Sequence, residues 1–528
     1  MSTAWTSGNG IVLADLVPAR LRREWVERGY CPDADLYTLF ARQALAHPER
    51  AAVVDPIGAV CYSTVDRWVR GVAGALSAAG LGSRDIVGIQ VPNGRLAVVA
   101  ELAVAAIGAV ALPLPGKGVG RDVVSLLARS KASAVIVPKG GLAVPRDRLP
   151  LLRKVFPLAV GDVDPCWRPG DVDPEAPARI LVSSGSEAEP KMVAYSHNAM
   201  AGGRAAYVRA LSGGVDPMRN LVLVPLASSF GSLGTSVTVA ALGWTLLLPE
   251  SFEPTAALRM ITEHRPTHVF GVPTMLRRMT ECVAGPGECL DSLRAVVASG
   301  AALSEATVEA CRSRLGCAVI TVYGSSDGVN CHTALDGMRP GGGAGRQDPE
   351  VAEIRIVDAE GSPVPAGEEG EIVSLGPMTP LCYVGAPELD ARYRLPGGWV
   401  RTGDQGRLDG AGRLHVTGRL KQIVVRGGYN ISLAEMEQQL SAHPLVADAA
   451  CLAVADADLG ERLCACVTQR PDTPALSLRE VTRFLSEERG VERRKLPESL
   501  VLLPELPVGA TGKVCRRTLS AMVSGGVR

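Results

Sequence analysis

Short apolar runs that alternate with helix-like segments constrain the fold of this chain most strongly. Fully apolar strands separated by helices are typical of parallel sheets that are covered on both faces. Loops at the carboxyl ends of such strands are the expected place for functional residues. The strand-like runs are 91–94, 134–137, 179–182, 221–224, 245–248, 268–270, 295–297 and 319–322, with helix-like segments at 96–109, 121–130 and 304–315.

The pattern changes after about residue 350. Alternating apolar and polar residues at 352–357 and 370–374 indicate strands with one solvated face. The turn residues Asp409, Gly410 and Gly412 predict a hairpin within 407–415. Helices are expected at 433–442 and 478–489. The chain is therefore predicted to be an α/β protein with a large multi-lobed domain over 1–418, including a β-rich lobe, a joint at 419–422 and a small α+β domain over 423–528.

Composition excludes several classes of function. The 528 residues are enough for two to four domains. Lys and Arg number 55 and Asp and Glu number 55, without a basic stripe, so we expect no nucleic-acid partner. The 13 cysteines are scattered, the closest pair being Cys464 and Cys466, and they form neither a zinc pattern nor a disulfide ladder. A reducing cytoplasm is the expected location.

Targeting and membrane segments are not expected either. The N-terminus has no basic segment followed by an apolar block, as a signal peptide would. Residues 96–112 are almost wholly apolar, but Glu101 lies near their middle and Pro113 follows them directly. This stretch is predicted to be a buried helix that runs into a strand rather than a membrane span.

Residues 183–191, Ser-Ser-Gly-Ser-Glu-Ala-Glu-Pro-Lys, form the first motif with chemical meaning, and they follow the strand-like run 179–182. Backbone N–H groups of such a loop can surround phosphate oxygens while the Lys191 ammonium neutralises their charge. Taken alone, the segment is equally well explained as an ordinary Ser- and Glu-rich surface loop.

Further motifs follow in a fixed order. Residues 323–327 read Tyr-Gly-Ser-Ser-Asp, and Asp327 offers the hard oxygen that Mg²⁺ requires. Residues 399–404 end in Asp404, whose carboxylate can accept hydrogen bonds from both hydroxyls of a ribose. Residues 418–421 read Gly-Arg-Leu-Lys, and residues 506–516 contain Thr-Gly-Lys513. Each motif is weak alone, and their specificity lies in the set.

This ordered set resembles the adenylate-forming superfamily of acyl-CoA synthetases, free-standing adenylation domains and luciferases, over about residues 36–520. The resemblance implies that Lys513 bridges the acid carboxylate and the α-phosphate, and that Lys421 is the hinge of a mobile small domain. It also implies that Gly427 and Gly428 admit a pantetheine arm and that Asp327 holds Mg²⁺. The ATP and AMP contacts that it implies are Ser183, Ser184, Gly185, Ser186, Lys191, Gly300, Ala301, Ala302, Tyr323, Gly324, Ser326, Asp404 and Arg419.

The phosphate loop departs from the family pattern. Glu187 stands where the family has threonine, and Ala188 and Met192 replace glycines. Because Glu187 and Glu189 place carboxylates near the departing pyrophosphate, weaker ATP binding is expected.

The acyl pocket is expected to begin at 225–231, which resembles the family segment that opens this pocket. Amino-acid-activating members have an aspartate there, and none is present, so an α-amino acid is not expected. Ser228 and Ser229 replace the bulkier His-Asn of aryl-acid members and make room for a larger or more apolar acid. The residues expected to line the pocket are Ser228, Ser229, Phe230, Gly271, Ser299 and Val322.

The expected enzyme is an acid–thiol ligase of natural-product biosynthesis that uses ATP, Mg²⁺ and CoA. It would convert an aromatic, cycloaliphatic or terpenoid acid into an acyl-AMP and then into an acyl-CoA. Residues 16–30 also resemble aryl- and alicyclic-acid ligases. Transfer to a carrier protein, or release of the acyl-AMP to a partner enzyme, is the alternative. A nucleotide-binding protein that no longer adenylates is disfavoured by Lys191, Asp404 and Lys513. The oligomeric state is left open, with a homodimer as one option.

Overall fold

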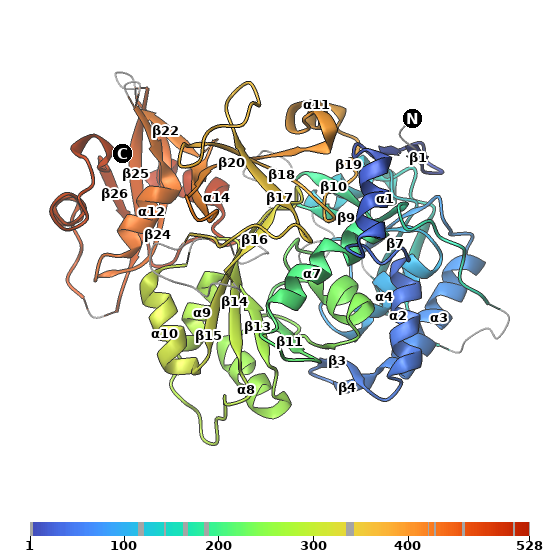
Figure 1. Ribbon diagram of the computed structural model, residues 1–528. Coiled ribbons are helices and arrows are strands. Elements are labelled where there is room, and N and C mark those ends of the chain that lie inside the picture. Colours follow the sequence, from blue (N-terminus) through green and yellow to red (C-terminus); the bar gives the residue numbers. More distant parts are fainter. Residues whose placement is uncertain are drawn as a thin grey trace.

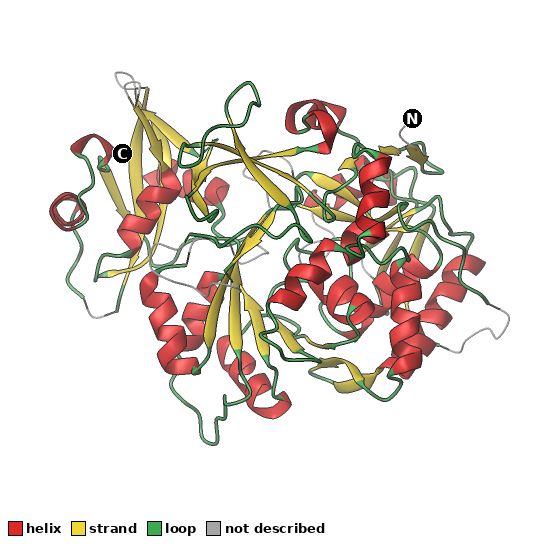
Figure 2. Cartoon of the chain, viewed as in Figure 1, coloured by secondary structure: helices red, strands yellow, loops and turns green. Residues whose placement is uncertain are grey.

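The computed structural model describes residues 4–114, 121–141, 144–161, 167–183, 190–301, 303–333, 343–420, 422–426, 429–456, 460–471, 473–509 and 513–526. Within these residues the chain forms two large sheets, a β-rich lobe and a smaller C-terminal domain (Figures 1 and 2). These parts confirm the predicted α/β class, with a large N-terminal domain and a smaller C-terminal one.

The first large sheet has a parallel centre and antiparallel strands at one end. Its core strands are buried on both faces, as the fully apolar runs predict. β10 pairs antiparallel with both β9 and β19. The strands in spatial order are β19 (Cys382–Tyr383), β10 (Met192–Ser196), β9 (Pro177–Val182), β6 (Val110–Pro113), β5 (Ile86–Ile89), β7 (Ala134–Pro138) and β8 (Lys154–Leu158).

The second large sheet is parallel except at its two edges. β16 pairs antiparallel with β15, and β4 pairs antiparallel with β3. The strands in spatial order are β16 (Asn330–His332), β15 (Ala318–Gly324), β14 (Ala295–Ser299), β13 (His268–Gly271), β11 (Arg219–Val222), β12 (Thr245–Leu247), β3 (Ala51–Asp55) and β4 (Gly58–Cys61). The carboxyl ends of β13, β14 and β15 lie at one edge, where functional loops were expected.

Helices cover the large sheets, and one core contains residues of both sheets. α4 has ten consecutive buried residues, Ala97 to Ala106, and continues through a turn into β6. The apolar stretch 96–112 is therefore a buried helix and strand, and no helix in the described ranges is long and apolar enough to cross a membrane. The helices of this domain are α1 (Ala19–Glu27), α2 (Leu36–Ala46), α3 (Tyr62–Ala78), α4 (Arg95–Ala106), α5 (Arg121–Arg129), α6 (His197–Ala201), α7 (Gly203–Ala210), the π-helix η2 (Gly234–Ala241), α8 (Pro254–His264), α9 (Pro273–Thr280), α10 (Glu305–Leu315) and α11 (Pro387–Tyr393), with two 3₁₀ turns at Arg146–Arg148 and Pro396–Gly398.

The β-rich lobe has the predicted alternation. In β17, Ile354 and Ile356 are buried while Glu353 and Arg355 are exposed. β20 and β21 form the predicted hairpin, which closes through Asp409, whose N–H donates to the Arg413 carbonyl at 3.0 Å. The strands are β17 (Glu353–Val357), β18 (Gly370–Leu375), β20 (Val400–Leu408) and β21 (Leu414–Arg419), and a separate hairpin near the N-terminus comprises β1 (Ala4–Thr6) and β2 (Val12–Ala14).

The C-terminal domain has its own apolar cores on the two sides of its sheet. In Figure 1 it lies beside α9 and α10 of the large domain. Its elements are β22 (Ile423–Arg426), β23 (Tyr429–Ser432), α12 (Leu433–Ser441), β24 (Val446–Asp456), β25 (Gly460–Gln469), α13 (Leu478–Arg483), the π-turn η4 (Phe484–Glu488), a 3₁₀ turn at Arg493–Lys495, β26 (Ser499–Leu502) and α14 (Arg516–Gly526).

One local prediction was wrong, and another was confirmed only in part. Residues 91–94 are a loop, and the strand β5 ends before them at Ile89. Pro92 cannot donate to a ladder, and Gly94 adopts a φ of 143° before α4 begins. The helix expected over 478–489 ends as an α-helix at Arg483 and continues as a π-turn.

Candidate active site

A cleft of about 3390 Å³ lies between the carboxyl ends of the parallel strands in the second large sheet, the β20–β21 hairpin and the C-terminal domain. Most of the predicted site residues line this cleft. They are Ser183, Lys191, Ser228, Ser229, Phe230, Ser299, Gly300, Ala301, Val322, Tyr323, Gly324, Ser326, Asp327, Asp404, Arg419 and Lys513. The predicted residues that lie outside the described part of the chain are Ser184, Gly185, Ser186, Ala302, Lys421, Gly427 and Gly428, together with Glu187, Ala188 and Glu189 of the phosphate loop.

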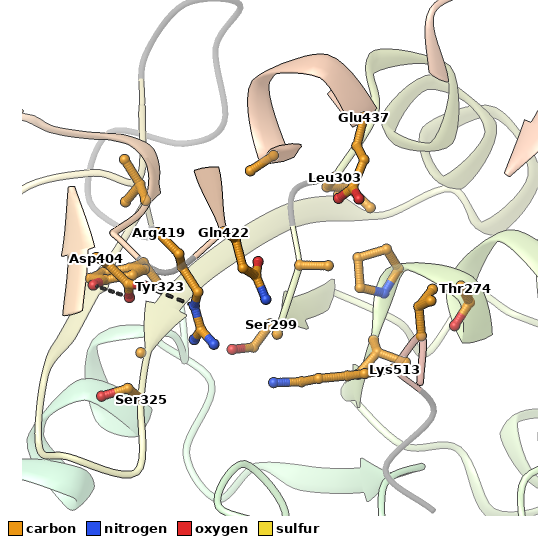
Figure 3. Close-up of a pocket in the computed structure, with 18 of the residues that line it drawn as sticks. Thr274, Ser299, Leu303, Tyr323, Ser325, Asp404, Arg419, Gln422, Glu437 and Lys513 are labelled. Atoms are coloured by element: carbon orange, nitrogen blue, oxygen red, sulfur yellow. Dashed lines mark hydrogen bonds and ion pairs between the residues drawn. The ribbon is translucent and has the colours of Figure 1, made fainter. Parts of the chain in front are cut away.

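Lys513 reaches from the C-terminal domain to the end of β14. A β-carbon built on Gly300 would lie 2.6 Å from Cε and 3.2 Å from Nζ of Lys513. Gly300 also has a φ of +96°, which side-chain-bearing residues rarely adopt. Figure 3 shows the lysine extending toward Ser299. Glycine at position 300 therefore leaves the space that the lysine occupies.

The electrostatic surroundings of Lys513 lower its pKa to about 8. Burial is the main cause because it disfavours the charged ammonium, and the nearby Arg419 adds repulsion, whereas Asp404 acts in the opposite direction. The backbone N–H of Gly509 donates to the Lys513 carbonyl at 2.8 Å and fixes the chain at the lysine. An anionic substrate in the cleft would stabilise the charged form of this lysine.

Asp404 is the centre of a buried polar cluster. Its Oδ2 accepts a hydrogen bond from the Tyr323 hydroxyl at 2.7 Å, and its Oδ1 accepts one from Arg419 Nε at 2.8 Å (Figure 3). Asp404 and Arg419 face each other in the register of β20 and β21. Burial raises the pKa of Asp404, although Arg419 and Tyr323 favour the carboxylate. The cluster offers a carboxylate, a guanidinium and an aromatic ring to one ligand.

Asp327 lies beside this cluster and matches the needs of a phosphate-bound cation. Its Oδ1 accepts a hydrogen bond from the Tyr383 hydroxyl at 2.5 Å, and its side chain lines the cleft. No group of three or more His, Cys, Asp or Glu side chains in the described ranges could hold a metal by itself. A single carboxylate is sufficient for Mg²⁺ when substrate phosphates provide other ligands, so Asp327 fits that role.

Ser183 and Lys191 close the base of the predicted phosphate loop. The Ser183 N–H donates to the Lys191 carbonyl at 2.9 Å, and the Lys191 N–H donates to Ser183 Oγ at 3.1 Å. The Lys191 ammonium lies 3.8 Å from the centre of the Tyr393 ring and 5.6 Å from that of Tyr383. These aromatic faces hold the cation at the cleft.

The part of the cleft where the acyl pocket was expected contains residues that the sequence reasoning did not identify. Arg204 and Tyr207, both on α7, line it together with Ser228, Ser229 and Phe230. The Ser228 hydroxyl donates to the Pro225 carbonyl at 2.7 Å, which stabilises the loop. Gly271 lies on β13 against Leu223 and Leu276, and it is not among the residues that line the cleft. Arg204 carries a weak sequence signal, as the charge in the run Ala-Gly-Gly-Arg-Ala-Ala at 201–206.

These elements form a cleft between a large and a small domain whose charged and aromatic groups suit a nucleotide and an acid. Sequence comparison gives the family. The family model described as AMP-binding enzyme matches residues 40–384, and the model described as AMP-binding enzyme C-terminal domain matches residues 435–513. The chain belongs to the AMP-binding enzyme family and hence to the adenylate-forming superfamily, and it is an adenylate-forming ligase.

Three similar proteins illustrate the family. The chain is 30% identical to the medium-chain fatty-acid–CoA ligase of Escherichia coli, over 93% of this chain and 91% of that protein. It is 29% identical to the salicyl-AMP ligase / salicyl-S-ArCP synthetase of Mycobacterium tuberculosis, over 95% and 93%. The solved structure of the amide bond synthetase McbA from Marinactinospora thermotolerans has a TM-score of 0.79 at 30% identity, covering 92% of this chain and 99% of that one.

Proposed function

We propose that this enzyme uses ATP to convert an aromatic, cycloaliphatic or terpenoid carboxylic acid into an acyl-AMP and then transfers the acyl group to CoA. The observation that carries the proposal is the approach of Lys513 to Gly300, beside the cluster of Asp404, Tyr323 and Arg419. This approach brings a cation of the small domain to the place where a nucleotide would bind on the large domain.

In the first half-reaction a carboxylate oxygen of the acid attacks the α-phosphorus of ATP, and pyrophosphate leaves. Lys513 would stabilise the charge that develops on the oxygens, since a positioned cation in a cleft lowers the barrier electrostatically. Asp404 and Arg419 would hold the ribose, and the ring of Tyr323 would lie against the adenine. Mg²⁺, held by Asp327, would neutralise phosphate charge. Lys191 would neutralise negative charge on the departing pyrophosphate.

In the second half-reaction a thiolate attacks the acyl carbonyl, and AMP leaves with its phosphate oxygen. The proposed division places the large domain at 1–418, the joint at 419–422 around Lys421, and the small domain at 423–528. Rotation about the joint would withdraw Lys513 and present Gly427 and Gly428 to the pantetheine arm. The acceptor is CoA in the leading proposal and a carrier-protein pantetheine in the alternative, which the M. tuberculosis relative favours.

The surroundings of the acyl end support an acid other than an α-amino acid. Residues 225–231 contain no carboxylate that could receive an ammonium. The guanidinium of Arg204 lines the same region and would repel an ammonium.

Exchange of labelled pyrophosphate into ATP with a panel of acids tests the proposal. Aromatic, cycloaliphatic or terpenoid acids should support exchange, α-amino acids should not, and Lys513→Ala should abolish exchange. The acids that support exchange are then assayed with CoA and a pantetheinylated carrier protein as competing acceptors. Exchange that persists in the Lys513 variant, or that depends on an α-amino acid, contradicts the proposal.

A further inference from the structure

We propose that Arg204 selects an acid that carries a second anionic group, such as a second carboxylate, on its acyl portion. This inference rests on the proposed function because it concerns the acid bound in the same cleft. Arg204 lies on α7, and its side chain is among those that line the acyl end with Ser228, Ser229 and Phe230.

Arg204 is one of three arginines that are buried in the described part of the chain, and it differs from the other two in its partners. Arg22 forms an ion pair with Asp15, and Arg179 forms one with Glu101. Arg204 is only 3% exposed, as they are, yet no carboxylate of the described residues pairs with it. Its Nε is buried and has no hydrogen-bond partner in this part of the chain; the same is true of Arg179, so the lack of an ion pair is what distinguishes Arg204.

The groups that Arg204 contacts directly are neutral, and the nearest charge that acts on it is the cation of Arg179. Its Nη1 donates to Ser232 Oγ at 2.8 Å and to the Ser229 carbonyl at 3.3 Å. Its guanidinium carbon lies 5.0 Å from the centre of the Tyr195 ring. These contacts hold the group in place, and none of the described residues among them supplies a negative charge.

A buried charge without a counter-ion is strongly unfavourable, and a ligand that supplies the counter-ion offsets this cost. Glu101 is already the counter-ion of Arg179, so Arg179 does not compete with Arg204 for such a ligand. A carboxylate fits the fork of a guanidinium and can accept from its free edge. A neutral apolar acyl group at this point would leave Arg204 buried and uncompensated.

The start of α7 is packed closely enough to fix the position of Arg204. A β-carbon on Gly203 would lie 2.9 Å from the Val351 carbonyl, and one on Gly202 would lie 2.7 Å from Cys31 Sγ. The helix therefore cannot easily shift to expose the guanidinium to water. Because the guanidinium of Arg204 is fixed in position, it should favour an acid whose second anionic group reaches that point.

Matched pairs of acids test the inference with the full-length enzyme. The pairs are benzoic acid with isophthalic and terephthalic acids, and cyclohexanecarboxylic acid with its 1,3- and 1,4-dicarboxylic counterparts, all in pyrophosphate exchange. The unmodified enzyme should favour a diacid over its monoacid in kcat/KM. In Arg204→Gln this diacid-to-monoacid ratio should fall on the order of 10- to 100-fold, the usual worth of a charged hydrogen bond. Arg204→Lys should restore part of it.

Ser232→Ala is the matched control because it removes one neutral contact of Arg204 and keeps the charge. It should leave the diacid-to-monoacid ratio unchanged. Equal losses for both acids of a pair in Arg204→Gln and in Ser232→Ala would show that Arg204 only braces the loop, and would overturn the inference. A preference for monoacids in the unmodified enzyme would overturn it as well.

A thermal-shift measurement separates this inference from the proposed function. The diacid should raise the Tm of the unmodified enzyme more than that of Arg204→Gln, whether or not exchange occurs. Such a shift without exchange of any acid would contradict the proposed function and support the role of Arg204. Exchange with equal rates for both acids of each pair, and no differential shift, would support the proposed function and overturn the role of Arg204.

Discussion

Arg277 of α9 and Asp448 of β24 form an ion pair that joins the large domain to the small one. Both side chains are partly buried, at 21% and 27% exposure, and burial raises the pKa of Asp448. This pair exists in the arrangement in which Lys513 lies against Gly300. It therefore stabilises the arrangement that we assign to the first half-reaction.

Asp448→Asn should weaken that arrangement. The loss is expected to be about 1 kcal/mol for a partly exposed pair, which is roughly a several-fold decrease in pyrophosphate exchange. Thioester formation from supplied acyl-AMP should be unchanged or faster. Glu281→Gln is the control, since Glu281, directly after the end of α9, binds the same arginine at 2.6 Å within the large domain. A decrease of the same size in both variants would contradict a role for the pair between the domains.

Gly300→Ala should displace Lys513. The added methyl group would meet the lysine at 2.6 Å, and alanine would be strained at a φ of +96°. Strain of this kind costs about 1–3 kcal/mol, so exchange should fall roughly 5- to 100-fold. Thioester formation from supplied acyl-AMP should fall less than exchange, because the lysine that the methyl group displaces takes no part in that step. A loss of the same size in both half-reactions would show that Gly300 does not act through Lys513.

The pH dependence of the first half-reaction should report Lys513. Its pKa is lowered to about 8, so the required ammonium predominates below that pH and is lost as the pH rises through it. The kcat/KM for ATP in pyrophosphate exchange should therefore decrease above about pH 8. Lys513→Arg should abolish this alkaline limb at a lower overall rate, since arginine stays charged. An alkaline limb that persists in that variant would assign the titration to another group.

Lys421→Pro should block the second half-reaction more than the first. Proline fixes its own φ and restricts the residue before it, so the joint could not turn. Single-turnover assays would show acyl-AMP accumulating without thioester. If the variant forms thioester at the unmodified rate, rotation about position 421 is wrong.

The sequence predicted the parts of the fold that depend on local apolar patterning. The run 134–137 is β7, and 295–297 lies in β14, because buried parallel strands are apolar on both faces. The hairpin at Asp409 and Gly410 followed from turn chemistry. The antiparallel position of β10 beside β9 was not predictable, since pairing partners are selected by tertiary contacts and not by the strand's own residues.

The site residues also fall into those that sequence motifs predicted and those that only the structure revealed. Asp404 and Lys513 were found because they belong to motifs with a recognisable order, and the structure brings both to one cleft. Arg204 belongs to no motif, and the role that we propose for it arises from its burial without an ion pair to a described carboxylate, which only the folded chain reveals. Likewise, the pairing of Arg277 with Asp448 joins residues 171 positions apart.

The bond between Asp404 and Arg419 has a consequence for the timing of the reaction. Arg419 stands two residues before position 421, and its guanidinium is held by the carboxylate that the ribose would also use. In the proposed mechanism, a nucleotide whose ribose hydroxyls donate hydrogen bonds to Asp404 therefore changes how firmly the start of the joint is anchored. Binding of a ribose to Asp404 would therefore change how freely the small domain rotates. The sequence of steps could then be enforced by the substrate itself, without a separate sensor.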